Sequence, residues 1–192
     1  MAGAFTAVAD DLTATYWNPA GLHQLTRQEA SALYARNFVP MNYYYFAYGR
    51  PIFGAGAVAA SWIRMDTGDL REVKEGFNLG NSFGDTQNAI FLSYGRRISY
   101  KKNAVANAFA IGVSAKFLFH SLYGKRAFGF GVDLGAMFEV KKVRGLQFGL
   151  NIQNVVPPRM TLNGTTDKFP LTMRMGVAYK MLYDNLIVSA DF

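Results

Sequence analysis

The chain alternates apolar and polar residues at a period of two through most of its second half. In the stretch 128–140, an apolar side chain occupies every second position, and glycine or a charged residue fills most positions between. The stretches 108–120, 146–153 and 171–181 repeat this pattern, with Leu118 as an exception. Because successive side chains of a strand point to opposite faces, each stretch predicts a strand with one apolar and one polar face.

The first half of the chain continues this pattern more weakly and predicts four further strands, at 28–37, 42–50, 55–64 and 88–98. A last strand begins near Leu186, which gives nine strands in all. The connections alternate in length. Those at 51–54, 99–106, 141–145 and 182–185 are mostly short, those at 65–87 and 154–170 are long, and 120–127 is intermediate. Short turns at one rim and longer loops at the other are typical of outer-membrane barrels.

The length of the strands and the composition of the chain both indicate the fold class. The best-defined strands are about ten residues long, whereas strands of soluble sheets usually have five or six. A soluble β-sandwich also alternates and is the alternative fold. Charged residues make up only 17% of the chain and aromatic residues 15%. The sequence therefore predicts an all-β fold, an antiparallel transmembrane β-barrel whose apolar face contacts lipid.

A transmembrane barrel turns the polar face of its strands toward the lumen. The ionisable residues predicted to face the lumen are Lys116, His120, Asp133, Glu139, Arg174, Lys180 and Asp191. They can pair with one another or with Asp10 and Asp11 near the N-terminus. The sequence leaves these pairings open.

The short turns, assigned to the periplasmic side, carry a group of basic residues. These are Arg50, Arg96, Arg97, Lys101, Lys102, Lys141, Lys142 and Arg144. A basic rim beside anionic phospholipid headgroups accounts for much of the net charge of +7. A generic solvated basic surface is the alternative interpretation.

The sequence predicts no enzyme active site, no metal site and no cofactor. The chain has no cysteine, and its histidines, His23 and His120, lack a sequence-local carboxylate or a metal-ligand spacing. The basic residues fall in turns and the aromatic residues on the opposite or outer face, so no nucleic-acid surface is predicted either.

The first 25 residues do not follow the alternation. They contain a motif made of Asp10, Asp11, Trp17, Asn18, Pro19 and Gly21. Asn18 before Pro19 predicts the start of a helix, because the Asn side chain accepts from free N–H groups and proline needs no donor there. The acidic pair is predicted to cap or charge-stabilise a short helical turn. A helix-turn entry into a soluble domain is the alternative.

The stretch from Met1 to Leu22 resembles the plug of FadL-like outer-membrane barrels, most closely the PorV/PorQ branch. The stretches Leu150–Pro157, Phe169–Tyr179 and Leu186–Phe192 also look like this family. The resemblance implies a plug over residues 1–25 and barrel strands over 26–192. It also implies that Met1 is an internal residue and that a secretory segment precedes it, because the family has a methionine just before its Gly-Ala-Phe-Thr stretch.

FadL-like barrels usually have fourteen strands. The resemblance therefore implies that the nine predicted strands are a fragment of a larger barrel, incomplete at the C-terminus. The alternative is an eight-stranded barrel that ends in an outer-membrane signature at Leu186, Val188, Ala190 and Phe192. That alternative requires the 28–37 strand to be discounted.

The resemblance implies a location in the bacterial outer membrane, with outer-membrane lipid as a partner. PorV/PorQ relatives serve type IX protein secretion and bind secreted cargo, which is the favoured expectation. FadL relatives move long-chain fatty acids and other hydrophobic compounds, and a structural or surface-antigen barrel is a third possibility. For secretion, Phe77, Leu79 and Phe83 could form an apolar docking surface, with packing against the barrel mouth as the alternative.

Overall fold

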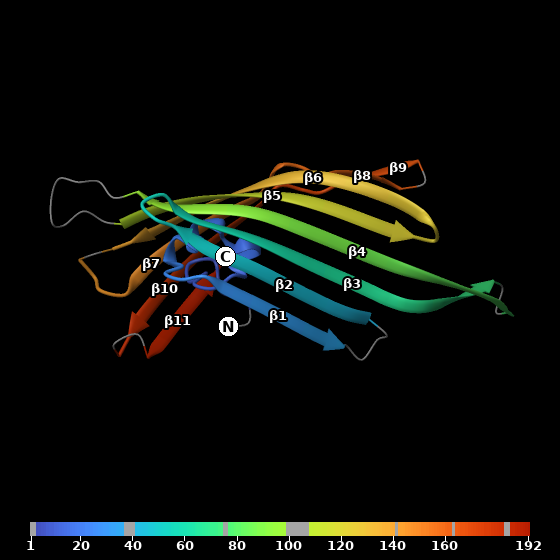
Figure 1. Cartoon of the computed structure of the whole chain (residues 1–192), viewed down its shortest axis with the longest axis horizontal. Helices are drawn as coiled ribbons and strands as arrows, with labels where there is room; N and C mark the ends of the chain where they lie inside the picture. Colours follow the sequence, from blue (N-terminus) through green and yellow to red (C-terminus); the bar gives the residue numbers. More distant parts are fainter. Residues whose placement is uncertain are drawn as a thin grey trace.

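The computed structural model describes residues 3–36, 41–74, 77–98, 108–140, 142–162, 164–182 and 185–192, with side chains described outside 69–83 and 108. Figure 1 shows a long, twisted sheet that bends round a short N-terminal segment, drawn in blue. We call residues 3–25 the N-terminal segment. The face of the sheet that packs on this segment is the inner face, and the opposite face is the outer face.

One antiparallel sheet of nine strands dominates the structure, in the order β1-β2-β3-β4-β5-β6-β7-β10-β11. The strands are β1 Glu29–Arg36, β2 Met41–Ile52, β3 Gly56–Lys74, β4 Phe77–Ile98, β5 Ala108–Leu122, β6 Lys125–Glu139, β7 Leu146–Val156, β10 Thr172–Met181 and β11 Leu186–Asp191. The predicted all-β fold is therefore confirmed. Strands β1 and β11 are the edges, and in the described part of the chain no pairing between them closes the sheet.

The register of the strands separates apolar from polar positions as the alternation predicts. In the β5–β6 pair, Val113 lies opposite Leu134, and one step along Ser114 lies opposite Asp133. Leu134 is 42% exposed on the outer face, whereas Asp133 is 1% exposed on the inner face. The period-two pattern thus assigned the faces of these strands correctly.

The predicted long loop over 65–87 is wrong. Strand β3 continues to Lys74 and β4 begins at Phe77, so most of this stretch is a paired extension of two strands. The register shifts between Thr67 and Leu70 and again between Arg71 and Val73. Backbone pairing needs no apolar alternation, so a polar, glycine-containing stretch can still form a ladder with bulges. The side chains of the proposed docking residues lie outside the described ones.

The other two predicted loops at this end also contain ordered structure. A two-residue turn, Tyr123 and Gly124, joins β5 to β6, so the predicted connection 120–127 is shorter than expected. Both residues have positive φ, 51° and 73°, as a type I′ hairpin turn requires. The connection 154–170 contains a small hairpin of β8 Arg159–Leu162 and β9 Thr165–Lys168.

The N-terminal segment contains two short helical turns, α1 (Ala14–Trp17) and the 3-10 helix η1 (Pro19–Gln24). Its Leu12, Leu22 and Leu25 pack with small inner-face residues of β2 and β3 and form the largest buried apolar cluster described. The core of this protein therefore lies between the segment and the inner face of the sheet.

None of the helices described is long and apolar enough to cross a membrane.

Candidate functional site

Asn18 stands at the centre of the N-terminal segment and is fully buried. Its Oδ1 accepts a hydrogen bond from Ala20 N at 3.2 Å and caps η1, as the Asn-Pro pair predicts. Its Nδ2 donates to Thr6 O at 2.8 Å and to Ala136 O of β6 at 3.1 Å. One side-chain amide therefore starts the helix, closes the segment on itself and ties it to the sheet.

The acidic pair has a smaller role than the sequence predicts. Asp11 Oδ1 accepts from the backbone N and the hydroxyl of Thr13, at 2.7 Å and 2.5 Å, so Asp11 stabilises the turn that precedes α1. No side chain caps α1 itself. Asp10 and Asp11 are both exposed, and within the described residues neither forms an ion pair with the inner-face charges.

A row of glycines lets the backbone of the N-terminal segment lie directly on the sheet. Gly95, Gly112 and Gly135 lie side by side on β4, β5 and β6. A Cβ atom at any of them would come nearer than 3.0 Å to residues 18–20, mostly to backbone atoms. Only glycine permits this approach, because any larger residue would push the segment away from the inner face.

The same device recurs on the next strands and within the segment. Gly149 and Gly176 pair across β7 and β10, and a Cβ at either would collide with the backbone of residues 6–7. A Cβ at Gly21 would collide with the carbonyl of Ala9, where the segment crosses itself. Gly21 is therefore needed for a close crossing of the backbone rather than only for a short turn.

Amide side chains of β7 bind the backbone of α1. Asn151 Nδ2 donates to Trp17 O at 2.7 Å, and Gln153 Nε2 donates to Tyr16 O at 2.9 Å. The guanidinium of Arg174, on β10, lies 5.8 Å and 5.3 Å from the ring centres of Tyr16 and Trp17. A cation over an aromatic face is attracted to its π electrons, so Arg174 holds the two rings from the side of β10.

The last strand, β11, holds the start of the segment. Asp191 Oδ2 accepts from the backbone N–H groups of Phe5 and Thr6, at 3.1 Å and 3.0 Å. Ser189 donates its hydroxyl to Ala4 O at 2.8 Å. A carboxylate that accepts from two N–H groups makes strong, charge-assisted bonds. The chain is thereby clamped from residue 4 onward to an edge strand nearly its whole length away in sequence.

Lys116 and Asp133 form a buried ion pair on the inner face, with Nζ and Oδ1 2.6 Å apart. The same Oδ1 accepts from Asn154 N at 2.7 Å. Asn154 has φ 61°, and its Nδ2 donates to Pro170 O at 2.6 Å. Asp133 therefore holds β7 at Asn154, and the Asn154 amide in turn holds Pro170, at the far end of the connection that carries the β8–β9 hairpin.

Three other predicted inner-face charges are placed as follows. His120 Nε2 lies 2.7 Å from Asp85 Oδ1 of β4, a partner that the sequence did not indicate. Glu139 pairs with Arg97 at 2.9 Å. Arg97 therefore lies on the inner face and is not part of a basic rim that faces outward. Lys180 also lies on the inner face, and no described acid pairs with it.

The basic rim is only partly visible. Arg50, Arg96, Lys142 and Arg144 are exposed, as the sequence predicts. The positions of Lys101, Lys102 and Lys141 lie outside the described residues.

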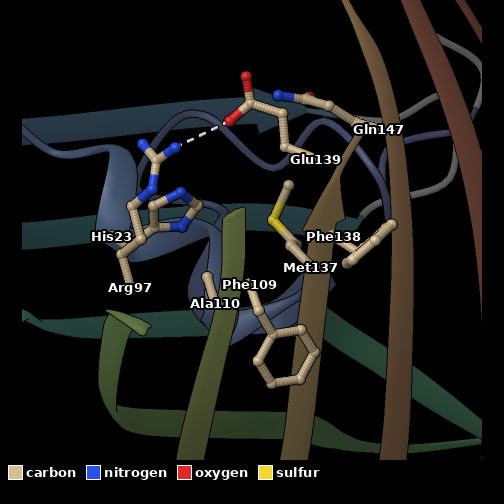
Figure 2. Close-up of a pocket in the computed structure, with 8 residues that line it drawn as sticks. All are labelled: His23, Arg97, Phe109, Ala110, Met137, Phe138, Glu139 and Gln147. Atoms are coloured by element: carbon tan, nitrogen blue, oxygen red, sulfur yellow. Dashed lines mark hydrogen bonds and ion pairs between the residues drawn. The ribbon is translucent and has the colours of Figure 1, made fainter. Parts of the chain in front are cut away.

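Figure 2 shows the region beside η1 where His23 lies near Arg97 and Glu139. Burial lowers the pKa of His23 below its usual value, and the neighbouring Arg97 lowers it further. A hydrogen bond between His23 Nδ1 and Ala20 O, 2.7 Å long, and the charge of Glu139 oppose this shift without cancelling it. The packing of the segment therefore favours the neutral imidazole.

A cavity of about 710 Å³ lies on the inner face beside α1 and the β8–β9 hairpin. Tyr16 and Trp17 line it on the side of the segment. Its apolar walls include Ile63, Met65, Phe91, Leu118, Met160 and Phe169. A few polar groups, among them His120 and Gln153, also reach it. An apolar cavity with a few polar groups is the usual form of a small-molecule site.

The sequence did not predict which residues hold the N-terminal segment on the sheet. The glycine row, the amides of β7 and the hydroxyl of Ser189 were not assigned this role. One signal was present: glycine stands at a polar-face position in five strands of the sheet, at Gly95, Gly112, Gly135, Gly149 and Gly176. A glycine repeated at one level of a sheet indicates that another backbone approaches there.

No protein-family model matches this chain, and no curated protein matches it either. The resemblance of the N-terminal motif to PorV/PorQ proteins therefore stays an expectation.

Proposed function

We propose that this chain forms most of the wall of a bacterial outer-membrane β-barrel of the PorV/PorQ type, with the N-terminal segment as its plug. We further propose that it serves type IX protein secretion by binding secretion proteins or their cargo at the membrane. The observation that carries the proposal is the contrast between the two faces of one sheet. The outer face is apolar and exposed, whereas the inner face carries small, polar and charged residues and packs against the N-terminal segment.

The outer face supports the membrane location. Phe46, Leu92, Phe128 and Met175 come from four strands and are each 51–53% exposed. Exposed apolar area costs about 25 cal/mol per Å² in water, and soluble monomers rarely expose continuous patches of more than a few hundred Å². Lipid removes this cost over the whole face. A soluble sandwich would instead need a second sheet to cover it.

The open edges support a larger barrel. Strands β1 and β11 leave one row of backbone groups each without a strand partner in the described residues. In hydrocarbon every backbone N–H and C=O needs a partner, so spanning sheets close into barrels. We therefore propose that further strands stand between β11 and β1.

The attachment of the plug supports a binding role over an open pore. Partly buried hydrogen bonds from β6, β7 and β11 hold the segment from residue 4 to residue 18. The glycine row brings the backbone of the segment directly onto β4, β5 and β6, so no space for a solute remains between them at that level. A segment held this closely suits a protein that presents a docking surface to other proteins rather than an open pore.

Affinity isolation of the full-length protein from outer membranes tests both parts of the proposal. Heat-modifiable migration on gels is expected, because folded barrels resist detergent unfolding until heated. Secretion-system proteins or secreted cargo are expected among the isolated proteins. A detergent-free monomer recovered from cytosol contradicts the membrane location. A folded barrel isolated with no protein partner and no small molecule favours a structural or surface-antigen barrel.

Uptake of hydrophobic compounds is the second candidate, and the 710 Å³ cavity favours it. Ala89→Trp would fill this cavity from β4, and Ala32→Trp makes the same change on the outer face of β1. If the protein carries long-chain fatty acids, Ala89→Trp lowers uptake of a labelled fatty acid and Ala32→Trp does not. Unchanged uptake in both variants, with secretion partners retained, leaves the secretion role as the function.

A further inference from the structure

A shallow groove of about 620 Å³ hollows the outer face near the ends of β2, β3 and β4. It lies on the opposite side of the sheet from the plug. Small residues on β3, Val58 and Ala60, form its floor. Larger side chains of the neighbouring strands, among them Tyr48 and Leu92, rise on both sides.

The strand register explains the shape of the groove. Arg50, Val58 and Tyr94 lie side by side across β2, β3 and β4. The next outward row is Tyr48, Ala60 and Leu92. The groove lies over these two rows and reaches Val113 and Ala115 of β5. The next outward residue of β3, Trp62, is 37% exposed.

The groove carries a positive charge at one end. Arg50 lines it, and Arg96 stands on the outer face of β4, two residues beyond Tyr94. Both arginines are exposed, and neither is paired with an acid among the described residues. The chain has no acidic residue over 30–65 or over 86–132. No acid from β2, from this part of β3 and β4 or from β5 can therefore neutralise them.

We propose that this groove binds one anionic glycerophospholipid, with its phosphate at Arg50 and Arg96 and an acyl chain along Val58 and Ala60. Guanidinium groups fit phosphate oxygens with paired hydrogen bonds. Arg50 lies two residues before the end of β2, so the charge stands at the rim while the apolar floor extends toward the middle of the sheet. This site rests on the proposed membrane location and adds a specific lipid to it.

Arg97, the neighbour of Arg96, shows why charge alone does not define the site. It turns to the inner face and is neutralised by Glu139. Arg50 and Arg96, in contrast, combine a positive charge without an acidic partner among the described residues with an apolar groove. That combination matches a ligand with an anionic head and a hydrocarbon chain.

The test uses the full-length protein, purified in a neutral detergent and titrated with phosphatidylglycerol or phosphatidylcholine, with bound lipid counted by native mass spectrometry. One phosphatidylglycerol is expected to bind in preference to phosphatidylcholine. Arg50→Gln is expected to weaken that binding about fivefold, which corresponds to about 1 kcal/mol for one cation near a membrane surface. Arg50→Gln with Arg96→Gln is expected to weaken it about 25-fold.

Ala60→Trp fills the groove without changing the charge and is expected to abolish the preference for phosphatidylglycerol. Two matched controls lie on the outer face of β1. Arg36→Gln removes one exposed arginine at the other end of the sheet, and Ala32→Trp adds the same bulk there. Both controls are expected to bind phosphatidylglycerol as the unmodified protein does.

Three results would overturn the site. They are equal binding of both lipids by the unmodified protein, equal losses in Arg36→Gln and Arg50→Gln, and full binding by Ala60→Trp. Heat-modifiable migration is measured first on each preparation. Failure of the unmodified protein to fold as a barrel overturns the proposed function and the site together, whereas a folded barrel without lipid preference overturns the site alone.

Discussion

The inner and outer faces of the sheet are built from the same strands, yet different physical rules govern them. On the outer face large apolar side chains stand partly exposed, and the contacts among them are apolar, such as the ring pairs Phe117–Phe130 and Phe119–Phe128. On the inner face glycines, amides and paired charges fit one specific segment at hydrogen-bond distances. The difference shows that the inner face is fitted to one particular segment, whereas the apolar outer face suits the lipid that we propose covers it.

The largest expected effect comes from breaking the buried ion pair of the inner face. Lys116→Met leaves the carboxylate of Asp133 buried without its cation, which costs about 3–5 kcal/mol. Urea unfolding of the protein in lipid vesicles measures this cost. Arg27→Met is the matched control, because Arg27 pairs with Glu29 at 3.7 Å on the exposed surface and such pairs contribute about 1 kcal/mol or less. Equal losses in both variants would mean that water reaches Lys116.

The next largest effect tests the solvent of the outer face. Leu134→Arg places a charge among outward apolar residues and is expected to cost about 2–4 kcal/mol near the middle of a bilayer. The same free energy of unfolding in vesicles is the measurement. Gln87→Arg, on the inner face beside the cavity, is expected to change stability far less. If both substitutions have small effects, lipid does not cover the outer face.

A smaller effect tests the fit of the plug. Gly112→Val puts side-chain atoms where the backbone of Ala20 lies, and overpacking of this kind costs about 1–3 kcal/mol. The N-terminal segment is then expected to become sensitive to added protease. Ala136→Val adds similar bulk on the outer face and is expected to leave protease resistance unchanged. A resistant Gly112→Val protein would show that the segment does not need this close approach.

The smallest effect is the pH dependence from His23. Burial lowers the pKa of His23 in the folded protein, so the unfolded chain binds the proton more tightly. Stability is therefore expected to fall as the pH drops below about 6.5, the usual pKa of histidine, until the folded protein is also protonated. His23→Gln is expected to weaken this dependence in unfolding curves measured from pH 7.5 to pH 5. An unchanged slope would mean that other groups cause it.

The alternation predicted the strands well because burial on one side and solvent on the other act on each residue locally. It failed over 65–87, where the polar and glycine-rich sequence suggested a loop although β3 and β4 continue to pair. A backbone ladder can continue without a side-chain pattern, so this error has a physical cause. The helix start at Asn18-Pro19 was also predicted correctly. Capping, like the strand pattern, depends on residues that lie close together in the sequence.

The sequence by itself determined the fold class, the two faces of the strands and the local helix start at Asn18. These features depend on period, on side-chain size and on neighbours within a few residues. Only the tertiary structure decided that Asp133 pairs with Lys116 and not with another cation, and that Asp191 binds the N-terminal backbone. These pairings depend on which side chains the strand register and the packed N-terminal segment bring together. Residues far apart in the chain have no local sequence signal that identifies them as partners.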